Sequence, residues 1–136
     1  MKKYLLHTSV LAALLNKRPG TLLLVKPWIA ANEAATSLLV YGEVIEYLKP
    51  KPRYKNRHQA IKKLLKEISP HSLSVSIVEC YAYIRLSLRR GKLIGDMDTL
   101  IAATAIEHNL TLVTIDPDFK RVANLKLMLL TREQLN

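Results

Sequence analysis

The chain has 136 residues, of which 49% are hydrophobic and 24% charged, with only 4 Gly and 6 Pro. These proportions exclude a disordered, collagen-like or low-complexity protein and suit one domain over residues 1–136. The 21 Lys and Arg residues against 11 Asp and Glu give a formal net charge of +10, which predicts attraction to nucleic acid or another polyanion. The single cysteine, Cys80, excludes an intramolecular disulfide framework and a cysteine-based zinc site, and it favours the reducing cytoplasm.

No apolar run approaches the ~20 residues needed to cross a bilayer, so we expect no membrane association. The N-terminal segment has the basic start and apolar stretch of a signal peptide. However, His7, Thr8 and Ser9 interrupt the apolar stretch, and no small-residue cleavage pattern follows it. We therefore expect this segment to belong to the folded domain.

In chain order, the apolar run at residues 4–6 predicts a short buried strand. Thr8 or Ser9 can cap a helix that extends to about Leu15, and Pro19-Gly20 ends it. The sequence leaves residues 22–30 open between strand and helix.

A helix beginning at Thr36-Ser37 follows, and Pro50 stops it. A second amphipathic helix covers residues 61–68 and is broken at Ser69-Pro70. Its apolar stripe has two interpretations, as part of the core or as an exposed surface for a partner or a second copy, and consists of Ile61, Leu64, Leu65 and Ile68.

Residues 73–75 are compatible with a strand, and Ser74 or Ser76 can cap a helix that extends to Arg90. The most apolar helix is predicted at residues 98–108, followed by a fully buried parallel strand at 110–114. Asp116-Pro117 begins another helix, and residues 125–130 suit a final strand. The alternation of strands and helices predicts an α/β fold around a mainly parallel sheet.

Three polar residues occupy positions where such a fold binds ligands, beyond the carboxyl ends of its strands. His7 follows the first strand, Asp116 follows the strand at 110–114, and Asp98 begins the most apolar helix. Asp116 before Pro117 is also an ordinary helix cap, and the helix dipole alone favours an acid at Asp98. Position alone therefore does not make either acid functional.

Glu43 lies on the apolar stripe of its helix, between Leu39, Val40, Val44 and Tyr47. A buried carboxylate must be paired, protonated or bound to a cation, and an internal arginine is the alternative to a metal. If Glu43, Asp98 and Asp116 converge, carboxylates ~4 Å apart repel by roughly 4 kcal/mol at an effective dielectric constant of about 20. A divalent cation with all-oxygen ligands, Mg²⁺ or Mn²⁺, would resolve this repulsion and could support phosphodiester hydrolysis.

Basic residues are concentrated in two segments, one before and within the helix at 61–68 and one near residue 90. Both are candidates for binding an RNA backbone, although such runs are also common on solvated faces. The candidate residues are Lys49, Lys51, Arg53, Lys55, Arg57, Lys62, Lys63, Arg89 and Arg90.

Three segments resemble a known family. Residues 4–11 (YLLHTSVL) resemble the opening of the PIN-domain ribonucleases, in which an Asp normally precedes Thr-Ser or Thr-Asn. Residues 94–105 (IGDMDTLIAATA) and 112–119 (LVTIDPDF) are similar to the corresponding motifs of VapC toxins. The resemblance covers most of the chain and is weakest between about residues 21 and 76.

This resemblance implies a three-layer α/β/α sandwich and a metal-dependent endoribonuclease, the toxin of a type II toxin–antitoxin pair. By motif position, Glu43, Asp98 and Asp116 would be the metal-site acids, with Mg²⁺ or Mn²⁺ as the cofactor. Accessory roles would fall to Thr8, Ser9, Thr114, Asp96 and Asp118. The implied partners are an RNA substrate, a cognate antitoxin and a second copy of the chain, with operator DNA bound only through the antitoxin.

The chain departs from the family pattern at His7, which stands where the first catalytic Asp is expected. Imidazole is a poor ligand for Mg²⁺ and suits Zn²⁺, Ni²⁺ or Cu²⁺ better. We therefore hypothesise that His7 impairs the nuclease. The alternatives are a non-catalytic PIN-like module that binds RNA or protein, and a receiver-like signalling domain, which the missing pair of acids after the first strand disfavours.

Overall fold

The computed structural model describes residues 1–136. Its strands are β1 (Tyr4–Leu6), β2 (Ala34–Ser37), β3 (Ser69–His71), β4 (Thr111–Thr114) and β5 (Leu127–Leu129). Its helices are α1 (Thr8–Leu15), α2 (Pro19–Ala30), α3 (Leu38–Leu48), α4 (Tyr54–Leu65), α5 (Val75–Leu88), α6 (Asp96–Glu107), the 3₁₀ helix η1 (Pro117–Arg121) and α7 (Arg132–Leu135). None of the helices combines the length and apolar character needed to span a bilayer.

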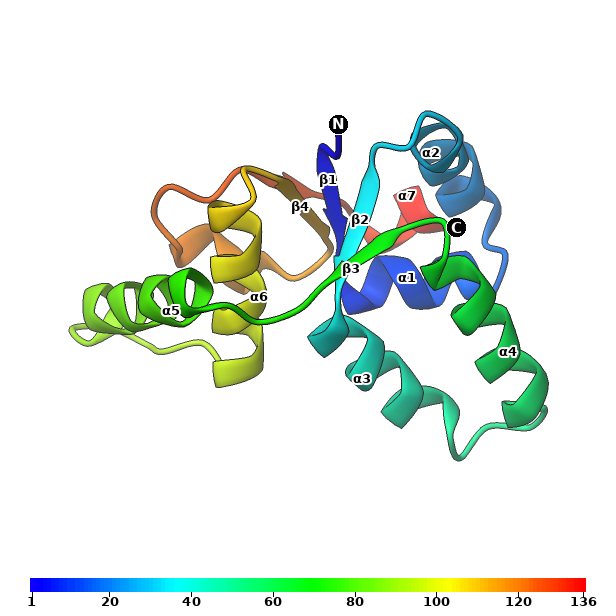
Figure 1. The fold of residues 1–136 in the computed structure, drawn as a ribbon, viewed down its shortest axis with the longest axis horizontal. Coiled ribbons are helices and arrows are strands. Elements are labelled where there is room, and N and C mark those ends of the chain that lie inside the picture. The colour runs from blue at the N-terminus through cyan, green and yellow to red at the C-terminus, as the bar shows by residue number, and fades with distance from the viewer.

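All five strands are parallel, in the order β3-β2-β1-β4-β5. Figure 1 shows α5 and α6 on one side of this sheet and α1, α2 and α7 on the other, which confirms the predicted three-layer α/β/α sandwich. The order of the strands reverses at the neighbouring pair β1 and β4, so their carboxyl ends form the crevice in which parallel sheets bind ligands.

The central strands are buried on both faces because helices cover the sheet from both sides. Leu5, Leu6, Leu112 and Val113 are fully buried, as the continuous apolar runs predict. The small residues of α6, including Ala102 and Ala103, are also fully buried and let this helix pack closely. The positions of the strand ends therefore depend on a rigid apolar core.

The N-terminal third differs from the sequence expectation in two respects. Residues 22–30, which the sequence left open, lie in α2, and Pro19 begins this helix as its first residue, where its fixed φ and missing N–H are tolerated. The N-cap of α1 is His7 rather than Thr8 or Ser9, and its ring makes no capping hydrogen bond. The imidazole is therefore free to face other elements.

The strand expected at residues 73–75 is wrong, because β3 forms at Ser69–His71, where the sequence predicted only a break. Pro70 is tolerated there because β3 is an edge strand that pairs only with β2. Ser74 instead accepts a hydrogen bond from the amide of Ile77 and begins α5. The helix predicted at Asp116-Pro117 is the 3₁₀ helix η1.

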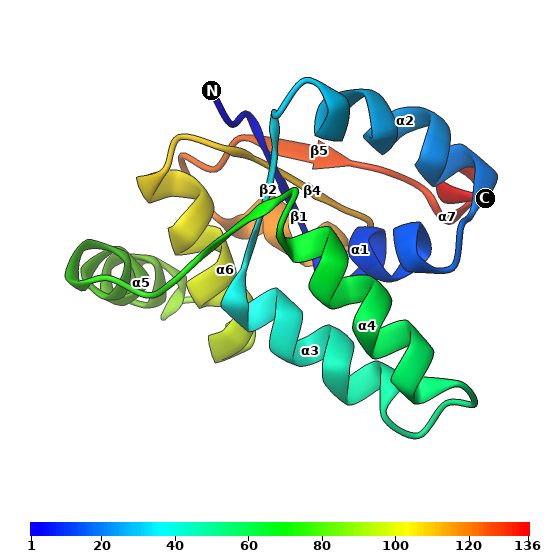
Figure 2. The ribbon, with the colours of Figure 1, turned by 45° about the vertical axis from the view of Figure 1, so that its right-hand side comes forward.

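Gly20 fixes the contact between α2 and α7, which Figure 2 shows next to each other. Its amide donates to the Asn136 carbonyl (3.0 Å), and a Cβ added to Gly20 would lie 2.2 Å from the backbone oxygen of Gln134. We expect Gly20→Ala to displace α7 and to lower the free energy of unfolding in urea by roughly 1–3 kcal/mol. Gly42 is the control, because it lies within α3 and an added Cβ would meet open space. We expect Gly42→Ala to raise the free energy of unfolding by about 0.5–1 kcal/mol. Equal effects at both sites would contradict this account of α7 docking.

His71 makes stability depend on pH. Burial lowers the pKa of His71, and the charges of His108 and Lys2 lower it further, while the two histidine rings stack with centroids 3.8 Å apart. Because protonation of His71 is disfavoured in the fold, its contribution to the free energy of unfolding is complete above the unfolded-state pKa of about 6.5. This contribution is lost as the pH falls below that value. We expect the urea midpoint to fall between pH 7.5 and 5, and to fall less in His71→Gln. An unchanged pH dependence in the variant would show that other groups cause it.

Candidate metal and nuclease site

Side chains from three distant segments meet beyond the carboxyl end of β1. His7 directly follows β1, Glu43 comes from α3, and Asp98 lies in the first turn of α6. One potential ligand atom from each of the three lies within 4.8 Å of the others. The crevice predicted from strand order therefore contains a cluster of two carboxylates and one imidazole.

His7 is held through both ring nitrogens and is only 7% exposed. Its Nδ1 lies 2.8 Å from Thr114 Oγ1, and its Nε2 lies 3.2 Å from Asp98 Oδ1. Thr114 Oγ1 already accepts a hydrogen bond from the amide of Asp116 (3.1 Å), so its own proton is free for Nδ1. This network is satisfied when Thr114 donates to Nδ1 and the Nε2–H group donates to Asp98.

Glu43 also has a protein partner. The Thr8 hydroxyl donates to Glu43 Oε1 at 2.5 Å. The carboxylate is half-buried rather than fully buried as its place on the apolar stripe suggested, since it lies at the edge of the core next to the crevice. No arginine pairs with it, which was the alternative considered for this residue.

Asp116 is near this cluster but not part of it. Its Oδ1 accepts a hydrogen bond from the amide of Asp118 (2.9 Å), which makes it the N-cap of η1. Asp116 nevertheless lines the same cavity as His7. Of the four site residues predicted from the sequence, His7, Glu43 and Asp98 form the cluster, and Asp116 lies beside it at the cavity that His7 also lines.

The other acids flanking the motifs have structural partners. Asp96 Oδ1 accepts a hydrogen bond from the Tyr81 hydroxyl (2.8 Å) and lies 3.1 Å from Arg85 Nη1. The hydrogen bond to Asp96 raises the pKa of Tyr81. Asp118 forms an ion pair with Arg121 at 3.4 Å. Asp96 therefore ties α6 to α5, and Asp118 stays within η1.

The two basic segments lie far apart. Lys49, Lys51 and Arg53 belong to the connection between α3 and α4, and α4 carries the other basic residues of this group. Arg89 and Arg90 follow α5, which is on the opposite side of the sheet from α4 in Figure 1. The nine candidates therefore form two separate surfaces.

A polar cavity of about 550 Å³ opens next to the cluster. His7, Thr8, Ser9 and Asp116 line one part of it, and the other lining residues include Asn16, Arg18, Tyr47 and Arg132. Sequence reasoning did not single out Arg18 or Arg132, because neither belongs to the two basic segments or to the motifs. Only the packing of α7 against α2 brings them to one cavity.

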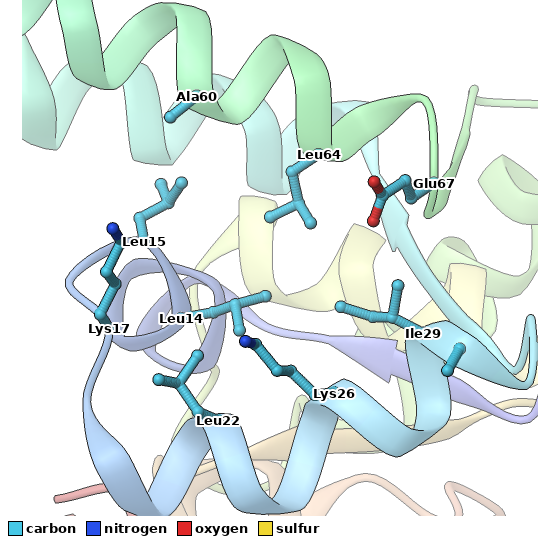
Figure 3. Close-up of a pocket in the computed structure, with 10 residues that line it drawn as sticks. Leu14, Leu15, Lys17, Leu22, Lys26, Ile29, Ala60, Leu64 and Glu67 are labelled. Atoms are coloured by element: carbon cyan, nitrogen blue, oxygen red, sulfur yellow. The ribbon is translucent and has the colours of Figure 1, made fainter.

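A second, apolar groove of about 650 Å³ runs between α1, α2 and α4. Figure 3 shows Leu14, Leu22, Ile29 and Leu64 pointing into it, with the charged groups of Lys17, Lys26 and Glu67 among them. The apolar stripe at residues 61–68 was predicted to be either core or an exposed surface, and each interpretation holds for part of it. Ile61 and Ile68 are fully buried, whereas Leu64 and Leu65 are half-buried. Part of the stripe is core, and Leu64 lines the groove.

Comparisons with known proteins agree with this architecture. The family model of the PIN domain matches residues 4–125. Ribonuclease VapC2 of Rickettsia felis is 32% identical over 126 residues, which cover 90% of this chain and 93% of the relative. The crystal structure of VapBC2 from Rickettsia felis bound to a promoter DNA fragment matches with a TM-score of 0.83 and 28% identity, over 93% of this chain and 98% of that one.

A toxin–antitoxin complex from Klebsiella pneumoniae shares the fold at 23% identity, with a TM-score of 0.73 over 90% of this chain and 95% of that one. The family match spans β1, β4 and all three residues of the cluster. The chain therefore belongs to the PIN-domain family and is of the VapC type.

Proposed function

We propose that this protein is a VapC-type endoribonuclease toxin whose nuclease activity is impaired by His7. The observation that carries the proposal is the contact of His7 Nε2 with Asp98 Oδ1 at 3.2 Å, inside a cluster that also contains Glu43. The similarity to Ribonuclease VapC2 supports RNA as the substrate. The basic surface of α4 supports binding of a polyanion.

The residues present do not fit Mg²⁺ as the family pattern would require. Mg²⁺ takes oxygen ligands in near-octahedral geometry, and the imidazole replaces one oxygen donor with nitrogen. The hydrogen-bond network also places a proton on Nε2, the nitrogen that faces Asp98. Glu43 and Asp98 remain suitable for Mg²⁺ or Mn²⁺, and a carboxylate at position 7 would complete the oxygen set, with Asp116 close by.

The second candidate function is a non-catalytic PIN-like module that binds RNA or protein. The same contact of His7 with Asp98 favours this module, because both ring nitrogens of His7 have hydrogen-bond partners in the protein without an ion. The two candidates differ in whether a carboxylate at position 7 creates nuclease activity.

We further propose that a cognate antitoxin binds this chain in the apolar groove of Figure 3. Complexes of the Rickettsia felis and Klebsiella pneumoniae relatives contain such partners. The groove presents Leu14, Leu22, Ile29 and Leu64, which suit the apolar face of an amphipathic segment, and Lys26 and Glu67 can set its orientation. Operator DNA would be bound only through the antitoxin.

A homodimer is the proposed assembly, and the outer face of α5 supports it. Val75 and Tyr83 on this helix are 75% and 74% exposed, and Val78 and Leu86 are also exposed. Such a concentration of exposed apolar side chains is typical of an interaction surface. The free thiol of Cys80 is consistent with the proposed cytoplasmic location.

Replacing His7 with Asp tests the proposed nuclease function. With Mg²⁺ or Mn²⁺, we expect His7→Asp to cleave structured RNA at least about tenfold faster than the parent chain, since even indirect partners of metal ligands contribute 10- to 100-fold. Expression of this variant should also arrest growth. Cleavage rate and growth are the two measurements.

His7→Asn is the matched control, because it has the size of Asp without its charge and is expected to stay inactive. Adding Asp98→Asn to His7→Asp should abolish the gain. If His7→Asp binds RNA but cleaves no faster than the parent, the nuclease proposal is wrong and the binding module is favoured.

Neighbouring leucines of α2 test the antitoxin groove. Leu22 lines the groove, whereas Leu23 is 81% exposed and lies outside it. We expect Leu22→Gln to weaken binding of the cognate antitoxin by about tenfold or more, as loss of a central apolar contact does. Leu23→Gln should bind like the parent in calorimetry, and similar losses in both variants would place the interface elsewhere.

A further inference from the structure

The polar cavity next to the cluster has a composition unlike that of the cluster itself. Its lining residues include two arginines, Arg18 and Arg132, and only one acidic side chain, Asp116. Arg18 precedes α2 and Arg132 begins α7, so these charges come from positions more than a hundred residues apart in the chain. A cavity of about 550 Å³ is large enough for a small organic ligand.

Both arginines lack protein partners. Neither Arg18 nor Arg132 makes a side-chain hydrogen bond or an ion pair, whereas Arg85 and Arg121 each pair with a carboxylate. An unpaired guanidinium presents five N–H donors in a planar fork that matches a phosphate. The cavity therefore has two free groups suited to a phosphodiester backbone.

The N-terminus of α1 adds donors to the same wall. The backbone amides of Thr8 and Ser9 donate to no protein group, and Ser9 Oγ is buried without a hydrogen-bond partner. Both residues line the cavity. Uncapped amides at a helix N-terminus favour an anion, in agreement with the two arginines.

Tyr47 supplies an aromatic surface on the same cavity. It lies on α3, is 42% exposed, and has the ammonium group of Lys51 4.9 Å from its ring centroid. Tyr47 is thus partly open to solvent at the cavity, which makes its ring available to a planar partner. Aromatic rings of this kind stack with unpaired bases, whereas the bases of a duplex are already stacked on each other.

We propose that this cavity binds one nucleotide of single-stranded RNA next to the bond that the nuclease site addresses. Tyr47 stacks on the base, while Arg18, Arg132 and the N-terminus of α1 bind the flanking phosphates. This inference rests on the proposed ribonuclease function and assigns to it a substrate subsite that requires no metal. The subsite favours an unpaired base, and residues outside the motifs thereby contribute to substrate choice.

Binding measurements in EDTA test the subsite apart from cleavage. The probe is a fluorescein-labelled, ten-nucleotide single-stranded RNA of mixed sequence, titrated with the full chain and followed by anisotropy at several KCl concentrations. We expect Arg18→Gln and Arg132→Gln each to weaken binding at least about fivefold and to reduce the slope of log K against log salt by about 0.7, one phosphate contact on a single strand. Thermal unfolding of each variant verifies that it is folded.

Tyr47 is tested with a pair of substitutions. Tyr47→Leu should weaken binding about tenfold, as loss of one stacked base does, while Tyr47→Phe should stay within about twofold of the parent. A duplex RNA of the same sequence should be insensitive to Tyr47→Leu, because its bases are not available to the ring.

Lys126→Gln is the control for general charge, because it removes the same charge from an exposed residue next to β5 and outside the cavity. Losses in this variant equal to those of the arginine variants would overturn the subsite. So would wild-type affinity in all the cavity variants, or a loss of affinity for the cognate antitoxin without a loss of affinity for RNA. Absence of RNA binding by the parent chain would instead refute RNA as the substrate, and with it the proposed function.

Discussion

The close approach of the Glu43 and Asp98 carboxylates is the constraint around which the crevice is organised. One ligand atom each from Glu43, Asp98 and His7 lies within 4.8 Å of the others, and two carboxylates about 4 Å apart repel by roughly 4 kcal/mol at an effective dielectric constant of about 20. The structure offsets this repulsion with two hydrogen bonds, from Thr8 to Glu43 and between His7 and Asp98. In an all-oxygen version of the site the same repulsion would be offset by a cation.

The strand order explains why these residues can meet at all. Since β1 and β4 are neighbours and their crossovers leave in opposite directions, His7 and Thr114 lie side by side at one end of the sheet. The chain of hydrogen bonds from the Asp116 amide through Thr114 to His7 then sets the orientation of the imidazole. A single residue after β1 thereby decides whether the crevice presents an oxygen or a nitrogen to Asp98.

Helix α1 separates two surfaces of different chemistry. Its C-terminal residues Leu14 and Leu15 border the apolar groove with α2 and α4, whereas its N-terminal residues Thr8 and Ser9 border the polar cavity with Arg18 and Arg132. Under the two proposals, an apolar protein segment and an anionic RNA segment would contact opposite ends of the same helix.

The sequence by itself determined the parallel α/β class, the helices that begin near Ser37 and Ser74, and the motifs around Asp98 and Asp116, because periodicity, capping and strand-end position are local properties. It did not determine β3, whose Pro70 is acceptable only at the edge of the sheet, or the helical state of α2. Only the tertiary structure decided that ligand atoms of His7, Glu43 and Asp98 lie within 4.8 Å of one another, and that Arg18 and Arg132 line one cavity. Within each of these two groups the side chains are 36 to 114 positions apart in the sequence, and such contacts depend on how the helices pack on the sheet rather than on any local pattern.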